Sequence, residues 1–178
     1  MKKVYGLLLV IAVVAAVVIS GAFKGGQVTN NEKSLNVVLS NQDYATLGNV
    51  EMESPVIKGN KLTNIKATFN APGDEAVIYF DIVNKGDDVI INKLTIDDPL
   101  FSAEGDNMEY EATKLASNFT YQLVYDSNGY QVQGGNLIER GTYKRVKLIL
   151  KYNEEVSEPI YSKVTVSGLN IEFSYENV

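Results

Sequence analysis

The sequence predicts an all-β protein: an antiparallel β-sandwich of the jelly-roll or immunoglobulin-like kind, with one short helical insertion and an N-terminal apolar helix before it. Hydrophobic and polar residues alternate over most of residues 35–178, which is the period of a strand with one buried face. The alternating segments are short and are separated by Gly, Pro, Asn and Asp turns. Each apolar face needs a second sheet to cover it, and no longer motif repeats as it would in a solenoid or propeller.

The predicted strands follow one another at short intervals along the chain. They cover residues 35–40, 62–69, 76–83, 89–96, 119–125, 142–152 and 164–175. The segment 142–152 alternates most regularly. Its basic residues Arg145, Lys147 and Lys151 share one side, which is most simply the solvated face of an amphipathic strand.

Two segments depart from a plain strand pattern. Residues 99–118 predict a short helix or an ordered loop, because three of their apolar residues have helical spacing. These residues are Met108, Ala112 and Leu115. The turn at 126–129 ends in Asn-Gly, which accepts the positive φ angles of a tight hairpin. We therefore expect residues 119–125 and 130–133 to form a β-hairpin.

The N-terminus predicts export. Lys2 and Lys3 precede the uncharged stretch Val4–Phe23, and small residues around Ala22 are typical of a signal-peptide cleavage site. If retained, the same stretch is long enough to anchor the chain in a membrane, with the lysines in the cytoplasm. Both alternatives predict an extracellular or cell-surface domain, which contacts a membrane only if this segment stays uncleaved. The expected parts are residues 1–22 (signal peptide or anchor), 23–34 (linker or extended arm) and 35–178 (β-sandwich domain).

The composition excludes several function classes. The chain contains no His, Cys or Trp, so the usual zinc, haem and iron–sulfur ligand sets are missing, as are Ser-His and Cys-His nucleophile pairs. Disulfides are excluded as well. The net charge of −6 argues against a nucleic-acid partner. We therefore expect no catalytic activity, no catalytic residues and no organic cofactor.

Acidic residues at turns leave calcium open as a ligand. The pairs Asp87-Asp88 and Asp97-Asp98, with Asp74 and Glu75, could supply oxygen ligands, although their spacing matches no calcium loop. Aspartates at turns mostly accept local backbone hydrogen bonds, which is the simpler interpretation. Paired carboxylates could also cleave a glycosidic bond, but the sequence does not show which of them lie together.

The eleven tyrosines raise the question of an adhesive or carbohydrate-stacking surface. Tyr121 and Tyr125 share a face with Phe119, which favours the core for both. The better candidates for surface binding of glycan or protein are Tyr79, Tyr130 and Tyr143.

The segment "APGDEAVIYFDIVNKGDD" and the terminal strand "SGLNIEFSYENV" give the chain a resemblance to a known group. In an exported chain they resemble the TasA and camelysin group of bacterial biofilm matrix proteins and the bundling pilins of archaea. The shared turn residues are Pro72, Gly73, Asp74, Asn84 and Gly86. The match is detailed over residues 60–98 and holds in outline elsewhere. This chain is shorter than the bacterial proteins and lacks their motif after the signal peptide, and without His it has no His-based metalloprotease site.

The resemblance implies subunits that polymerise head to tail by donor-strand complementation, with the chain itself as partner. A segment after the signal peptide would pair with an open sheet edge of the next subunit. Residues 25–40 offer such an arm, with Leu35, Val37 and Leu39 as the donor side chains. The alternative is that Leu35–Leu39 pairs within its own domain as the first strand.

Two functions follow as hypotheses. The first is an exported structural protein, a subunit of an extracellular fibre, pilus or biofilm matrix. The second is a membrane-tethered cell-surface module that recognises glycan or protein through its tyrosines and loops.

Overall fold

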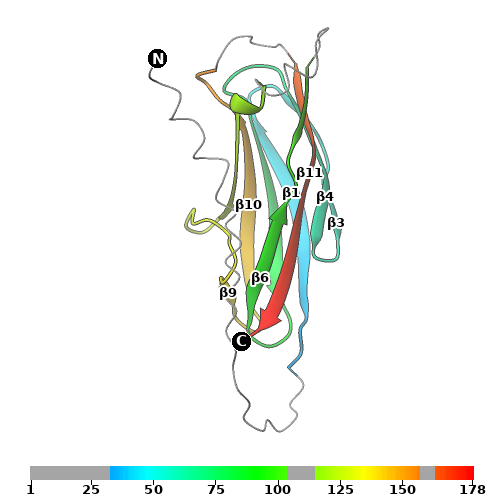
Figure 1. Ribbon diagram of the computed structural model, residues 1–178, viewed down its shortest axis with the longest axis vertical. Helices are drawn as coiled ribbons and strands as arrows, with labels where there is room; N and C mark the ends of the chain where they lie inside the picture. Colours follow the sequence, from blue (N-terminus) through cyan, green and yellow to red (C-terminus); the bar gives the residue numbers. More distant parts are fainter. Residues whose placement is uncertain (1–32, 104–114, 157–162) are drawn as a thin grey trace, which may run out of the picture. The chain divides into compact units, whose positions relative to one another are not determined.

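The computed structural model describes residues 33–103, 115–156 and 163–178 (Figure 1). They belong to one compact unit, Lys33–Val178. In these ranges the chain forms eleven β-strands arranged in two antiparallel sheets, so the predicted all-β class is confirmed. The predicted N-terminal apolar helix, the signal peptide or anchor and nearly all of the linker lie outside the described residues.

The first sheet, sheet A, has four strands that pair antiparallel throughout. In spatial order they are β1 (Val37–Leu47), β5 (Glu75–Asn84), β10 (Tyr143–Tyr152) and β8 (Phe119–Tyr125). β1 and β8 are the edge strands of this sheet. Regular alternation sets the register, because a slip by one residue would turn every apolar side chain to the wrong face.

The second sheet, sheet B, is built around the long C-terminal strand β11. Its strands are β2 (Val50–Glu53), β3 (Val56–Lys58), β4 (Lys61–Phe69), β11 (Val164–Asn177), β6 (Val89–Ile96), β7 (Leu100–Ala103) and β9 (Leu137–Ile138). β2 and β3 both pair with β4, and β7 pairs with β11 beyond the end of β6.

The two sheets share one hydrophobic core. Phe69 of β4 meets Phe119 of β8 edge to face, with ring centroids 5.1 Å apart. Phe80 of β5 meets Phe173 of β11 at 6.0 Å. Tyr152 is fully buried and stacks on Phe119. Each ring pair of this kind adds about 0.5–1.5 kcal/mol beyond the area it buries.

Several strands differ from the sequence-based prediction. β1 continues to Leu47, past a β-bulge at which Asn41 takes a φ of 53°. The strands β2, β3, β7 and β9 were not predicted, because each has only two to four residues and shows no readable period.

The predicted helical insertion is reduced in the described residues to a single turn at 115–117, while 104–114 lie outside them. Leu100–Ala103, expected within the insertion, form strand β7. The predicted turn before Tyr130 is present, with Gly129 at a φ of 72°. The predicted hairpin is formed in part. Val124 and Gln131 make an antiparallel bridge, and backbone hydrogen bonds join Tyr125 to Tyr130 and Val132 to Leu123, but residues 130–133 do not form a strand. A second turn at Gly134 and Gly135 then leads the chain to sheet B.

Candidate functional site

The Pro72-Gly73-Asp74 turn is held by the carboxylate of Asp74, which is buried. Its Oδ2 accepts hydrogen bonds from the backbone N–H groups of Asn70 and Ala71 at 2.8 and 2.9 Å. Its Oδ1 accepts from the N–H of Asn49 at 3.1 Å, in the turn between β1 and β2. One carboxylate thereby fixes two turns that are 25 residues apart.

The second motif turn, Asn84 to Gly86, is fixed by the side chain of Asn84, which is fully buried. Asn84 Nδ2 donates to the carbonyl oxygens of Asp87 and Ile138, at 2.7 and 2.9 Å. Its Oδ1 accepts from the N–H of Gly86 at 2.9 Å. The amide therefore uses both its donor and its acceptor atoms in shaping this turn.

The Asn84 turn receives the segment that leads into β1. The N–H of Lys85 donates to the carbonyl of Asn36 at 2.8 Å, and the N–H of Asp87 donates to the carbonyl of Ser34 at 3.0 Å. The carboxylate of Asp87 in turn accepts from the N–H of Ser34 at 2.8 Å. A Cβ atom at Gly86 would overlap the Ser34 carbonyl oxygen and lie 2.8 Å from the Asn36 nitrogen. Only glycine permits this approach.

Of the three predicted donor-strand residues, Leu35 lies just before β1, and Val37 and Leu39 lie at its start. Val37 and Leu39 are buried in the chain's own core, where they pair with Asn84 and Ile82 of β5. Leu35 is 54% exposed. The Asn84 turn contacts the segment that leads into β1, whereas the Pro72 turn lies at the other end of β5. The structure therefore brings Asn84 and Gly86 to the predicted donor segment, but not Pro72, Gly73 and Asp74.

The bulge in β1 is anchored to a charged cluster on the outer face of sheet A. Asp81 is only 6% exposed and pairs with the guanidinium of Arg145 at 3.0 Å. Asn41 donates to the other carboxylate oxygen at 2.7 Å, and Arg145 also donates to the Asn41 carbonyl. The Arg145 guanidinium lies 5.4 Å from the ring centroid of Tyr79. The face of Tyr79 is thus covered by an arginine.

Each residue of the predicted basic stripe forms an ion pair with an acidic residue. Besides Arg145, Lys147 pairs with Asp126 at 3.2 Å and Lys151 pairs with Glu154 at 3.1 Å. These pairs lie on the outer side of β10. The stripe is therefore balanced by acidic residues.

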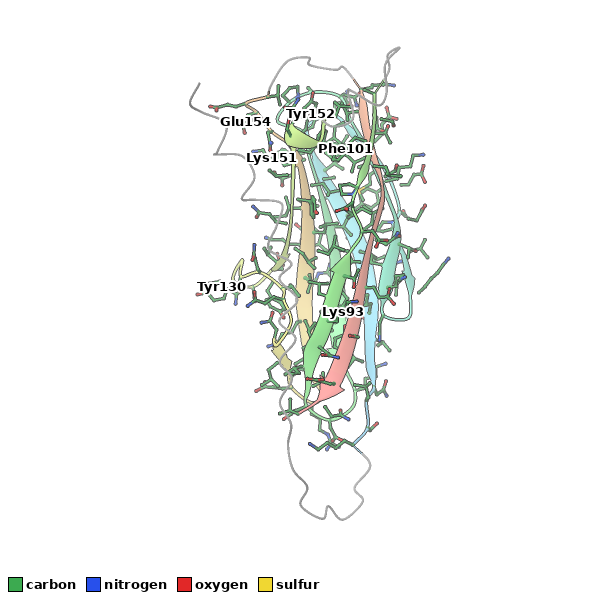
Figure 2. The ribbon with its side chains drawn as sticks, in the orientation of Figure 1. Lys93, Phe101, Tyr130, Lys151, Tyr152 and Glu154 are labelled. Atoms are coloured by element: carbon green, nitrogen blue, oxygen red, sulfur yellow. The ribbon has the colours of Figure 1, made fainter. Side chains whose placement is uncertain are left out.

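The other two candidate tyrosines are freely exposed. Tyr130 is 73% exposed and Tyr143 is 65% exposed. Figure 2 shows Tyr130 projecting away from the sheets, on the segment between β8 and β9.

A shallow pocket of about 200 Å³ lies beside that segment. It is lined by Tyr125, Ser127, Asn128, Asn136, Leu137 and Lys144. The Tyr125 hydroxyl donates to Asn136 Oδ1 at 3.1 Å, and burial raises the pKa of Tyr125 to about 12. The phenol therefore stays protonated at ordinary pH. Sequence reasoning did not find this pocket, because its residues come from three segments and have no common spacing.

At least one member of each acidic pair accepts a hydrogen bond from a residue distant in the sequence, not from a neighbouring backbone group. Asp88 accepts from the N–H of Arg140 at 2.7 Å, and Asp97 accepts from Asn170 Nδ2 at 2.9 Å. Among residues 33–103, 115–156 and 163–178, no three acidic groups gather where they could hold a metal ion. Calcium stays a prediction. In the same ranges the structure contains no helix long and apolar enough to span a membrane.

Comparison with known proteins gave no match to a family model, to a curated protein or to a solved structure.

Proposed function

We propose that the chain is an exported structural protein, the subunit of an extracellular fibre, pilus or biofilm matrix, without catalytic activity. Its consecutive strands β4, β5 and β6 alternate between the two sheets. Connections of this kind are typical of jelly-roll and immunoglobulin-like sandwiches, and the proposal includes a fold of that kind. Export rests on the N-terminal pattern of two lysines and a long uncharged stretch.

The observation that carries the proposal is the way in which the start of β1 is held. Residues 33–40 contact the Asn84 turn and one side of β5, and Lys33 also forms hydrogen bonds with Asn177 and Val178 at the end of the chain. β1 is an edge strand. A neighbouring copy presents the same turn and the same β5, so the segment makes identical contacts within its own chain or in the next one. Because these contacts are the same, exchange of the segment between subunits costs little free energy.

The bulge at Asn41 gives this segment a natural boundary. The pairing of β1 with β5 shifts between Ser40 and Asp43. Residues before the shift are partly buried in the core, and residues 41–47 are exposed. Asn41 itself is held by Asp81 and Arg145. The donor segment ends where this anchor begins, so the rest of β1 stays with its own subunit.

Repetition of the exchange produces a filament rather than a closed ring when the contact is head to tail. Each subunit donates residues 33–40 to the next and receives the equivalent segment from the one before. Main-chain hydrogen bonds to β5 supply affinity, and the buried Val37 and Leu39 fix the register.

The test is filament growth of the exported protein at increasing concentration, followed by light scattering and negative-stain microscopy. We expect filaments from the wild type and from Gly134→Ala, whose added methyl group would meet only ordinary contacts at 3.5 Å or more. Gly86→Ala is expected to form none. Failure of the wild type to assemble at any concentration, or equal assembly by Gly86→Ala, would contradict the proposal.

A further inference from the structure

The pocket beside β8 has a donor-rich lining. Asn136 Oδ1 already accepts from the Tyr125 hydroxyl and from the backbone N–H of Gln133, at 3.1 and 2.9 Å. The NH₂ of Asn136 donates no hydrogen bond among the described residues, so it is the end of this amide that can meet another partner. Asn128 Oδ1 likewise accepts from the N–H of Tyr130 at 3.0 Å, so its NH₂ is also left over.

The charge of the pocket contrasts with that of the whole protein. The chain carries a net charge of −6, yet none of the six lining residues is acidic. Lys144 is the one charged residue of the lining. Within the described ranges it takes part in none of the ion pairs, although Arg145 and Lys147 next to it both do. A cation with no acidic partner, beside amide donors, favours a ligand with negative charge and acceptor oxygens.

Apolar groups lie beside these donors. Tyr125 and the exposed Leu137 both line the pocket. Tyr130 and Tyr143 are not among the lining residues, and Tyr143 points to the opposite face of β10 from Lys144. An aromatic and an aliphatic side chain next to hydrogen-bond donors present an apolar surface together with polar groups that fix orientation.

We propose that this pocket binds a carboxylate-bearing sugar unit, such as one uronate residue of an acidic polysaccharide. Lys144 contacts the carboxylate, Asn128 and Asn136 donate to acceptor oxygens, and the sugar ring lies against Tyr125 and Leu137. The pocket is smaller than the roughly 300–1,000 Å³ of sites for drug-sized ligands, so it holds one sugar ring rather than a longer oligosaccharide. The site lies away from the β1 edge, and its occupation does not depend on polymerisation.

The experiment is titration of the ¹⁵N-labelled protein with glucuronate, with glucose as the neutral control, followed by NMR and calorimetry. We expect shifts of the backbone amides at 125–130, 136–137 and 144 with glucuronate, and at least tenfold weaker binding of glucose. Absence of binding, equal binding of both sugars, or shifts confined to another region would each overturn the proposal.

Two variants test the assigned roles. Asn136→Asp keeps an acceptor oxygen for Tyr125 and Gln133 but replaces the amide donor with a negative charge, and it should abolish glucuronate binding. Lys144→Gln should weaken binding about tenfold, because a hydrogen bond to a charged group is lost. Lys93→Gln is the control, since Lys93, like Lys144, has no ion pair among the described residues but lies on a different strand, β6 (Figure 2). Unchanged binding by both pocket variants would place the ligand elsewhere and refute the site.

Discussion

Replacement of Gly86 by alanine is the most informative single change for the docking of β1. The position does not require a positive φ, so alanine is acceptable to the local backbone. The effect is purely steric, because the methyl group would overlap the carbonyl oxygen of Ser34. The segment from Lys33 to Asn36 must then move away from the Asn84 turn.

The expected loss follows from the contacts at that turn. Movement of the segment breaks three hydrogen bonds: from Lys85 to Asn36, from Asp87 to Ser34, and from Ser34 to the Asp87 carboxylate. At about 0.5–1.5 kcal/mol for each bond, this lowers the free energy of unfolding by about 1.5–4.5 kcal/mol. Loosening of Val37 and Leu39, which follow directly in the core, would add to this value.

Urea unfolding of the monomer at low concentration measures this loss, with Gly134→Ala as the control. Gly134 also lacks a positive φ, and its added methyl group has room. Hydrogen exchange of the amides at 37–40 reports whether the start of β1 becomes loose. A destabilisation by Gly86→Ala of less than about 0.5 kcal/mol, or one equal to that of the control, would refute the reasoning.

Three further predictions concern the polar groups that support the sandwich. Asp74→Ala removes the acceptor of three backbone N–H groups and should lower the free energy of urea unfolding by about 2–3 kcal/mol; a loss under about 1 kcal/mol would contradict its assigned role. Arg145→Gln leaves the buried carboxylate of Asp81 without its cation, and about 1–2 kcal/mol should be lost in the same assay; an unchanged midpoint would show that the pair is unimportant. Burial raises the pKa of Tyr125 to about 12 from an ordinary value of 10.0, so the folded state keeps a proton that the unfolded state has released. Stability should therefore be complete below pH 10 and fall as the pH rises toward 12, by about 1 kcal/mol per pH unit for this group, and Tyr125→Phe should show a shallower fall; identical pH profiles of the two proteins would rule this cause out.

The sequence predicted the long strands well because their pattern reports burial directly. β4, β5, β10 and β11 have one face in the core and one toward solvent, and their apolar residues alternate accordingly. β1 was predicted only to Ser40, because beyond the bulge its residues 41–47 are exposed and carry no apolar period. The strand predicted at 130–133 failed because two glycines soon after it turn the chain away.

The contacts of the functional residues were harder to predict from the sequence. Asp74 and Asn84 stood out as turn residues, and both proved to be buried and fully engaged in holding turns. The meeting of Gly86 with Ser34 joins residues about fifty positions apart, which no local pattern reveals. The pairing of Arg145 with Asp81 depends in the same way on the register of two strands.

Cross-linking between chains tests the exchange of β1 most directly. The chain contains no Cys, so single cysteines report only on the chosen pair. Val38 and Val83 face each other across β1 and β5, and opposite residues of this kind lie about 5.5 Å or less apart at Cα, within the range of a disulfide. A mixture of Val38→Cys and Val83→Cys proteins is assembled, oxidised and separated on a denaturing gel. Thr68→Cys with Thr165→Cys is the control, because this pair joins β4 and β11 within one sandwich. Exchange of β1 predicts disulfide-linked dimers in the first mixture and none in the second; filaments without linked dimers in the first mixture would contradict the exchange.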